Sequence, residues 1–192
     1  MLKIGNTAPD FALASSSGEV TGLKSLRGRK VVLYFYPKDM TPGCTQEACD
    51  FRDNMARLTG RGVAVLGVSS DSPASHTKFK DKYSLPFELL SDPEFAVTKI
   101  YGAYGSKLLY GQKVTGTIRT TYLIDERGKI AALWSPVKVE GHVDEVLTAI
   151  RELDLNGSPP RSRPRPGSIA RSAGSRPKSA RSRRMIGADP AH

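Results

Sequence analysis

Two cysteines, five residues apart, are the side chains of this 192-residue sequence best suited to covalent chemistry. Cys44 and Cys49 both fall in one short segment, TPGCTQEAC, which starts at Thr41. A structural zinc site needs about four ligands, and this segment offers two sulfurs and no neighbouring histidine. A disulfide scaffold would need more pairs that join distant segments. The spacing therefore favours a reactive dithiol, and we expect neither a metal nor a cofactor.

Thr41 and Pro42 predict the start of a helix that carries Cys44 in its first turn. Threonine is a suitable N-cap and proline suits the first helical position, so Cys44 becomes the third helical residue. Unpaired backbone N–H groups and the positive end of the helix dipole favour a thiolate at that place. The alternative for Cys44 is a small buried core residue without chemistry.

Cys49 falls further along the same predicted helix, with its Cα atom about 8.7 Å from that of Cys44, given the rise and rotation of an α-helix. A disulfide tolerates at most about 7 Å between Cα atoms. The two sulfurs can therefore join only after the first turns of the helix unwind. Two readings stay open from the residues alone: a redox cycle with local unfolding, or two unrelated thiols.

The segments around the cysteines alternate between strand and helix patterns. We expect strands at 31–36, 63–69 and 87–90, helices over 42–58, from Ser72–Pro73 and from Asp92–Glu94, a loop over 102–116, a hairpin of 120–124 with 129–134, and a final helix over 143–153. Crossover units at the front and a hairpin at the back predict an α/β fold, with a mixed central sheet flanked by helices.

The last 37 residues differ in composition from the rest of the chain. Residues 156–192 hold nine Lys and Arg, one acid and no aromatic residue, and so carry most of the formal net charge of +10. Such a segment cannot bury enough apolar surface to offset the entropy of ordering. We therefore predict a folded domain over 1–155 and a disordered basic tail over 156–192. The tail could bind nucleic acid non-specifically through phosphates, or simply be a solvated extension.

No apolar run of about 18 residues is present, and the first residues lack the apolar core of a secretory signal. These features predict a protein without a membrane segment, and a cytoplasmic location. His76, His142 and His192 show no metal-like spacing and are interpreted as ordinary polar residues.

The segment PKDMTPGC, from Pro37 to Cys44, with Cys49 behind it, is similar to the active-site segment of the peroxiredoxins. The similarity is to the bacterioferritin comigratory protein or peroxiredoxin Q group. It covers about residues 3 to 153 and includes GNTAPDF near the start and RTTYLID from Arg119. The resemblance implies a thioredoxin-like fold, thiol-dependent reduction of hydroperoxides and a role in antioxidant defence.

The resemblance also implies roles for single residues. Cys44 corresponds to the peroxidatic cysteine, which becomes a sulfenic acid, and Cys49 to the resolving cysteine. The Thr41 hydroxyl corresponds to the group that contacts sulfur and peroxide, and Pro37 to the ring that shields the thiolate. The resemblance further implies recycling by thioredoxin or a similar dithiol, and it favours a monomer.

Two more residues match the family pattern. Arg119 corresponds to an arginine that faces the same pocket, and Glu47 to the acid that orients this arginine. Without the motif, Arg119 would be interpreted as a surface charge, Thr41 as a helix cap and Glu47 as a solvated helix residue.

Two other functions compete with the peroxidase. One is a thiol–disulfide exchanger on the same fold, but such enzymes typically use C-x-x-C, whereas Cys44 and Cys49 are separated by four residues. The other is a redox-responsive nucleic-acid binder that acts through the basic tail.

Overall fold

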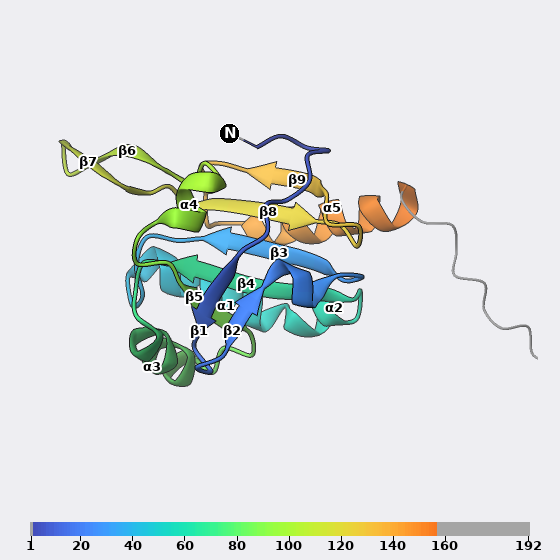
Figure 1. Ribbon diagram of the computed structural model, residues 1–192, viewed down its shortest axis with the longest axis horizontal. Coiled ribbons are helices and arrows are strands. Elements are labelled where there is room, and N and C mark those ends of the chain that lie inside the picture. The colour runs from blue at the N-terminus through green and yellow to red at the C-terminus, as the bar shows by residue number, and fades with distance from the viewer. Residues whose placement is uncertain (1, 157–192) are drawn as a thin grey trace, which may run out of the picture. The chain divides into compact units, whose positions relative to one another are not determined.

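The computed structural model describes residues 2–156, apart from the side chains of Lys107 and Leu109 (Figure 1). The expected domain boundary near Leu155 lies inside the last helix, which continues to Asn156. The expected disordered tail lies outside the described residues, except for Asn156. Within residues 2–156, no helix is long and apolar enough to cross a bilayer.

A seven-stranded mixed sheet forms the centre of the fold, with the strand order β2-β1-β5-β4-β3-β8-β9. Its strands β3, β4 and β5 are parallel, and the outer strands join them in antiparallel pairs. The strands are β1 (Ala12–Ser15), β2 (Val20–Gly22), β3 (Lys30–Phe35), β4 (Val63–Ser69), β5 (Glu88–Ser91), β8 (Thr120–Ile124) and β9 (Ile130–Trp134). The prediction of a mixed sheet is confirmed, although β1 and β2 were not predicted, because both strands are very short and largely exposed.

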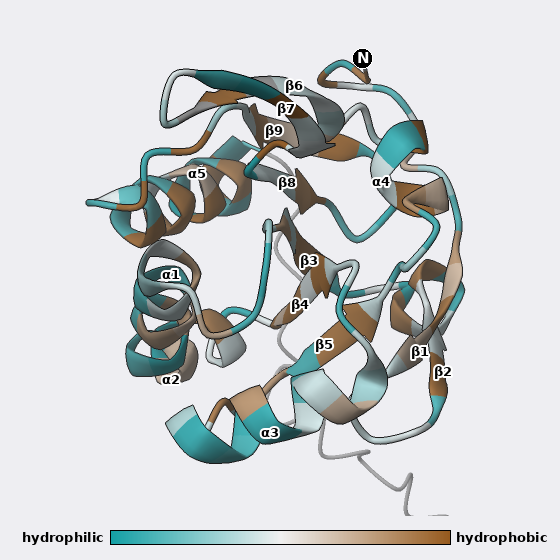
Figure 2. Ribbon diagram, turned by 90° about the vertical axis from the view of Figure 1, so that its left-hand side faces the viewer, coloured by the Kyte–Doolittle hydropathy of each residue, from teal (hydrophilic) through white to brown (hydrophobic). Residues whose placement is uncertain are grey.

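Helices cover both faces of this sheet (Figure 2). One face packs against α1 (Pro42–Asp53), α2 (Met55–Thr59), α3 (Pro73–Tyr83) and α5 (His142–Asn156). The other packs against the N-terminal segment, the 3₁₀ helix η1 (Leu23–Leu26) and α4 (Ala96–Ile100). Since side chains alternate along a strand, the continuous apolar run of β3 supplies both cores at once.

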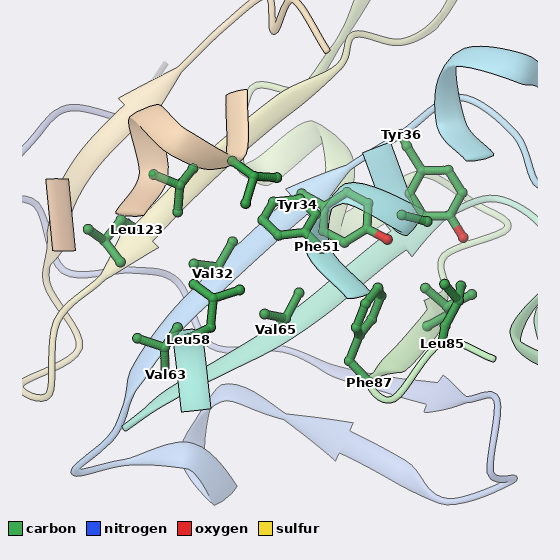
Figure 3. Close-up of a cluster of buried hydrophobic side chains, with 14 of the residues drawn as sticks. Val32, Tyr34, Tyr36, Phe51, Leu58, Val63, Val65, Leu85, Phe87 and Leu123 are labelled. Atoms are coloured by element: carbon green, nitrogen blue, oxygen red, sulfur yellow. The ribbon is translucent and has the colours of Figure 1, made fainter. Parts of the chain in front are cut away.

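The core beneath α1 is rich in aromatic rings (Figure 3). Tyr34 of β3 stacks on Phe51 of α1 with ring centroids 5.0 Å apart, and on Tyr36 at 5.4 Å. The Tyr34 ring also crosses Gly67 of β4, where a Cβ atom would lie 2.8 Å from the ring. These contacts determine how far α1 lies from the sheet at the ends of β3 and β4.

The single helix predicted over 42–58 is wrong, because the chain breaks at Asn54. Asn54 has φ −101° and ψ 7°, and its amide donates to the Asp50 carbonyl at 3.0 Å. The Asn54 backbone N–H donates to the same carbonyl at 3.2 Å, and side-chain bonds of this kind make asparagine unfavourable inside a helix. Two shorter helices, α1 and α2, result.

The loop predicted over 102–116 is also wrong. Strands β6 (Tyr104–Leu109) and β7 (Gln112–Thr117) form a separate antiparallel hairpin, which projects from the body of the molecule (Figure 1). Tyr110 and Gly111 both have positive φ values, 50° and 78°, as in a two-residue type I′ turn. The segment escaped prediction because its strands pair only with each other and show no buried alternation.

Two helix starts had opposite outcomes. Ser72 caps α3 as predicted, since its side chain accepts from the Ser75 N–H at 3.2 Å. The helix expected from Asp92–Glu94 begins only at Ala96. Asp92 is buried and its carboxylate accepts from the N–H groups of Ala96 and Thr98, at 2.9 and 2.8 Å. The Asp92 carboxylate, four residues before Ala96, thus accepts hydrogen bonds from backbone N–H groups in the first turn of α4.

Candidate active site

The first turn of α1 places Cys44 where the sequence predicts it. Thr41 is the N-cap residue with extended backbone, φ −77° and ψ 151°, and Pro42 opens the helix. Cys44 is therefore the third helical residue, and its side chain is 1% exposed within the core beneath α1. The sulfur lies at the positive end of a twelve-residue helix.

The hydroxyl of Thr41 does not make the expected capping bond. It donates instead to the Lys38 carbonyl at 2.9 Å, and no side-chain capping bond is formed at this N-cap. Met40 has a φ of 63°, so the chain turns sharply just before Thr41. The hydroxyl therefore closes the turn before the helix, and its contact with a peroxide stays a prediction.

Sheet register brings Arg119 to Cys44 from far along the chain. Because β8 runs antiparallel to β3, its first residue, Thr120, pairs with Phe35, the last residue of β3. Arg119 therefore stands beside the loop that leads into α1. Its backbone is held there by the Val137 N–H, which donates to the Arg119 carbonyl at 2.9 Å.

The guanidinium of Arg119 bridges Cys44 and Glu47. Its Nη2 atom donates to the Cys44 sulfur at 3.3 Å, and Nη1 donates to Glu47 Oε2. Glu47 is one turn beyond Cys44 on α1, so helical spacing aims both side chains at the same guanidinium. Gly43 leaves room for this approach, because a Cβ atom there would lie 3.3 Å from Arg119 Nη2.

Burial dominates the electrostatics of this group. Glu47 is 1% exposed, and its Oε1 atom has no hydrogen-bond partner among the described residues. Burial raises the pKa of Glu47 to about 7, and the nearby Arg119 offsets only part of that effect. For Arg119, burial lowers the pKa, but Glu47 and Cys44 outweigh it and the pKa is raised. Arg119 therefore stays cationic beside the sulfur.

Besides Thr41, two predicted residues are not in this cluster of contacts. Cys49 is a free, half-buried cysteine on the same unbroken stretch of α1 as Cys44, which is also free. The helical separation of about 8.7 Å between their Cα atoms therefore applies. Pro37 is half-buried on the loop before α1, and its shielding role stays a prediction.

The sequence did not single out two buried histidines near this site. His76 of α3 bonds to Asp39 of the loop before α1, with Nδ1 2.9 Å from Oδ2. His142 of α5 lies with Nε2 2.9 Å from the Thr121 hydroxyl, and burial, followed by the charge of Arg119, lowers its pKa to about 4. The spacing of His76 with Phe79 on the apolar face of α3 was the available signal. No cluster of three or more metal-ligating side chains occurs in residues 2–156.

The protein combines a thioredoxin-like sheet with a buried thiol at a helix N-terminus, and an arginine contacts this thiol. These features are typical of the class of thiol-dependent oxidoreductases with that fold. A family model described as the AhpC/TSA family matches residues 4–133, and the chain belongs to this family. A Bcp-named peroxiredoxin of Coxiella burnetii is 53% identical over 146 residues, which are 76% of this chain and 97% of the relative. Peroxiredoxin Bcp of Bacillus subtilis is 43% identical over 152 residues, 79% of this chain and 97% of the relative.

Solved structures agree with the family. The bacterioferritin comigratory protein of Xanthomonas campestris has a TM-score of 0.72 and 38% identity, over 79% of this chain and 97% of that one. The resemblance to this group and the thioredoxin-like fold are thus confirmed. The chain is a peroxiredoxin, and its relatives support a thiol peroxidase activity.

Proposed function

We propose that this peroxiredoxin uses Cys44 to reduce hydrogen peroxide and organic hydroperoxides. Cys49 then resolves the sulfenic acid formed on Cys44, and thioredoxin or a similar dithiol reduces the resulting disulfide. The reaction serves antioxidant defence. The observation that carries the proposal is the Arg119 guanidinium, with Nη2 3.3 Å from the Cys44 sulfur. A fixed cation at this place stabilises both a thiolate and the negative charge that develops on a leaving oxygen. A purely structural cysteine would need no such partner.

In the first step, the Cys44 thiolate attacks one oxygen of the hydroperoxide along the O–O bond. The S–O bond forms as the O–O bond breaks, and the second oxygen leaves with the bonding electron pair. It takes up a proton to become water or an alcohol, and the sulfur is oxidised to a sulfenic acid. We expect Arg119, which contacts the Cys44 sulfur, and the N–H groups of the first turn of α1 to stabilise this charge.

In the second step, the Cys49 thiol condenses with the sulfenic acid, forming a disulfide and releasing water. The first turns of α1 have to unwind before the sulfurs can meet, since a disulfide tolerates at most about 7 Å between Cα atoms. An external dithiol then reduces the disulfide through a mixed disulfide. The C-x-x-C pair of a thiol–disulfide exchanger needs no such unwinding, which makes exchange the weaker candidate for this chain.

One relative supports the proposed range of substrates. The bacterioferritin comigratory protein of Xanthomonas campestris has an alkyl peroxide reduction activity. This description supports the inclusion of organic hydroperoxides as substrates alongside hydrogen peroxide.

A peroxide-consumption assay on three forms of the reduced protein tests the proposal. The wild type should consume one equivalent of peroxide per Cys44 without a reductant, and turn over with thioredoxin and its reductase. Cys44→Ser should consume none. Cys49→Ser should react once and then lose thioredoxin-coupled turnover, or turn over only with a small thiol. Peroxide consumption by Cys44→Ser at the wild-type rate would refute the proposal.

A further inference from the structure

A buried polar network holds the loop that leads into α1, on the side away from Arg119. At its centre is the Asp39 carboxylate, which is buried and accepts three hydrogen bonds. Tyr36 donates to Oδ1 at 2.6 Å, while Ser75 and His76 lie 2.7 and 2.9 Å from Oδ2. Asp39 stands only two residues before Thr41, so these bonds fix the approach to the helix.

His76 faces hydrogen-bond acceptors at both ring nitrogens. Its Nδ1 atom is 2.9 Å from Asp39 Oδ2, and its Nε2 atom is 3.1 Å from the Leu90 carbonyl oxygen of β5. A carbonyl cannot donate, and neither can an ionised carboxylate. The Tyr36 hydroxyl is 3.4 Å from Nδ1, but it already donates its hydrogen bond to Asp39. Each nitrogen of His76 therefore needs its own proton.

Asp39 is the ionised partner in this arrangement. Burial raises the pKa of its carboxyl, but the hydrogen bonds from His76 and Tyr36 outweigh burial and hold the pKa below its usual value. Burial raises the pKa of Tyr36 well above its usual range, so the phenol stays a donor. Asp71 contacts the same loop from the chain between β4 and α3, where its Oδ2 accepts from the Asp39 N–H at 2.9 Å and from the Ser69 hydroxyl at 2.7 Å.

We propose that Asp39 and His76 form a buried ion pair, with His76 protonated on both nitrogens, which positions the loop before Cys44 for reaction with peroxide. The pair ties the loop to α3, and the Nε2 atom of His76 extends the connection to β5. The residue that follows Asp39, Met40, has a φ of 63°, which is uncommon for a residue other than glycine, so the loop has to be held in this conformation. Asp39 and His76 are thus positioning residues, and neither needs to touch the substrate.

Nitrogen-15 NMR of the full-length, reduced wild type at pH 7.5 tests the protonation state directly. Both nitrogens of His76 should give protonated signals, although an ordinary histidine is mostly neutral at that pH. His142 supplies an internal neutral reference, because its pKa is lowered to about 4. In Asp39→Asn, His76 should keep a single proton, on Nε2. A singly protonated His76 in the wild type at pH 7.5 would overturn the proposal.

Single-turnover kinetics tests the positioning role. In Asp39→Asn and His76→Gln, the second-order rate constant with hydrogen peroxide should fall by about 10-fold to 100-fold, the usual effect of a misplaced reacting group. Lys78→Ala, an exposed change on the same helix, is the matched control and should react like the wild type.

A folded Asp39→Asn protein that reacts within about twofold of the wild type at every pH would refute the positioning role. If a variant does not fold, the NMR measurement on the wild type decides. The kinetic arm rests on the proposed role of Cys44, whereas the NMR arm does not. Peroxide consumption by Cys44→Ser would therefore remove the proposed function and leave the doubly protonated His76 standing.

Discussion

Arg119 carries the charge that reaches both Cys44 and Glu47. Thiolate formation alone is a small effect, because full ionisation of a cysteine with a pKa of about 8.5 gains at most about 14-fold in thiolate at pH 7.4. A donor fixed where charge develops is typically worth about 10²-fold to 10³-fold. In the proposed reaction, we therefore expect Arg119 to act mainly on the leaving oxygen rather than on the ground-state thiolate.

Replacing Arg119 by alanine separates these two contributions. Arg119→Ala should slow the reaction of Cys44 with hydrogen peroxide by about 10²-fold to 10³-fold in a stopped-flow assay. A thiol titration of the same protein should show a much smaller loss of thiolate. Arg151→Ala, an exposed change on α5, serves as the control. If the loss of thiolate accounts for the whole loss of rate, the assignment to the leaving oxygen is wrong.

Glu47 gives a second test at the residue level, through stability. Its pKa of about 7 in the folded protein exceeds the ordinary value of 4.5, so the folded state holds the proton more tightly than the unfolded chain does. The stability linked to this proton is fully present below pH 4.5 and is lost as the pH rises through 7. Glu47→Gln cannot lose a proton.

Urea unfolding of the reduced wild type and Glu47→Gln at pH 4.5 and pH 8 measures this effect. Between the two pH values, the free energy of unfolding of the wild type should fall relative to that of Glu47→Gln, by about 3 kcal/mol at most. Loss of the contact with Arg119 adds a constant offset and does not change the sign. A difference between the two proteins that does not vary with pH would show that Glu47 titrates normally.

At the level of elements, α1 is the helix whose intact form keeps the two cysteines apart. Oxidation by one equivalent of peroxide should therefore unwind its first turns as the disulfide forms. In hydrogen exchange, the amides of residues 44–50 should exchange faster in the oxidised protein, while those of β3 and β4 keep their protection. Cys49→Ser given the same peroxide should show no such change. Unchanged protection of α1 in a protein proven to hold the disulfide would refute local unwinding.

Gly67 of β4 determines how closely the core can pack beneath α1. Gly67→Ala would place a Cβ atom 2.8 Å from both Tyr34 and Leu89, two fully buried side chains. Overpacking of this kind should cost about 1–3 kcal/mol in the free energy of unfolding, as measured with urea. Gly116→Ala in β7 is the matched control, because a Cβ there meets nothing within 4 Å. Equal stability of the two variants would mean that Tyr34 moves aside without cost.

The helix carrying Cys44 was predictable because its signals are local. Thr41 and Pro42 specify the helix start from adjacent residues, and helical spacing alone places Glu47 on the same side as Cys44. The position of Arg119 depends on the pairing of β8 with β3, which no local pattern encodes. Only the resemblance to a family pointed to it.

The network around Asp39 was hidden from the sequence for the same reason. Asp39 and His76 are 37 residues apart, and they meet because α3 packs beside the loop that precedes α1. The spacing of His76 with Phe79 hints at burial of the histidine, but nothing local marks Asp39 as its buried partner. The α1–α2 break occurs at a single residue, Asn54, whose side-chain bond to the Asp50 carbonyl is a local detail too small to read from a pattern.

At the level of the whole molecule, the β6–β7 hairpin forms a two-stranded sheet separate from the seven-stranded one. Its tip is exposed: Tyr110 is 98% and Leu108 is 77% accessible to solvent. Segments with few buried contacts contribute little to global stability. Cys44 and Glu47 lie on α1, and Arg119, which bonds to both, immediately precedes β8, so these three residues lie outside the hairpin.

Shortening the hairpin tests this separation. Gly105 and Gly116 are paired across β6 and β7, so an Asn-Gly turn can join them in place of residues 106–115. The shortened protein should keep its free energy of unfolding within about 1 kcal/mol and its peroxide rate within about threefold of the wild type. An insertion of three residues between Tyr110 and Gly111, at the exposed tip, serves as the control and should be equally harmless. A loss of peroxide reactivity in the shortened but folded protein would show that the hairpin contributes to the site, and would contradict the assignment of the chemistry to α1 and β8 alone.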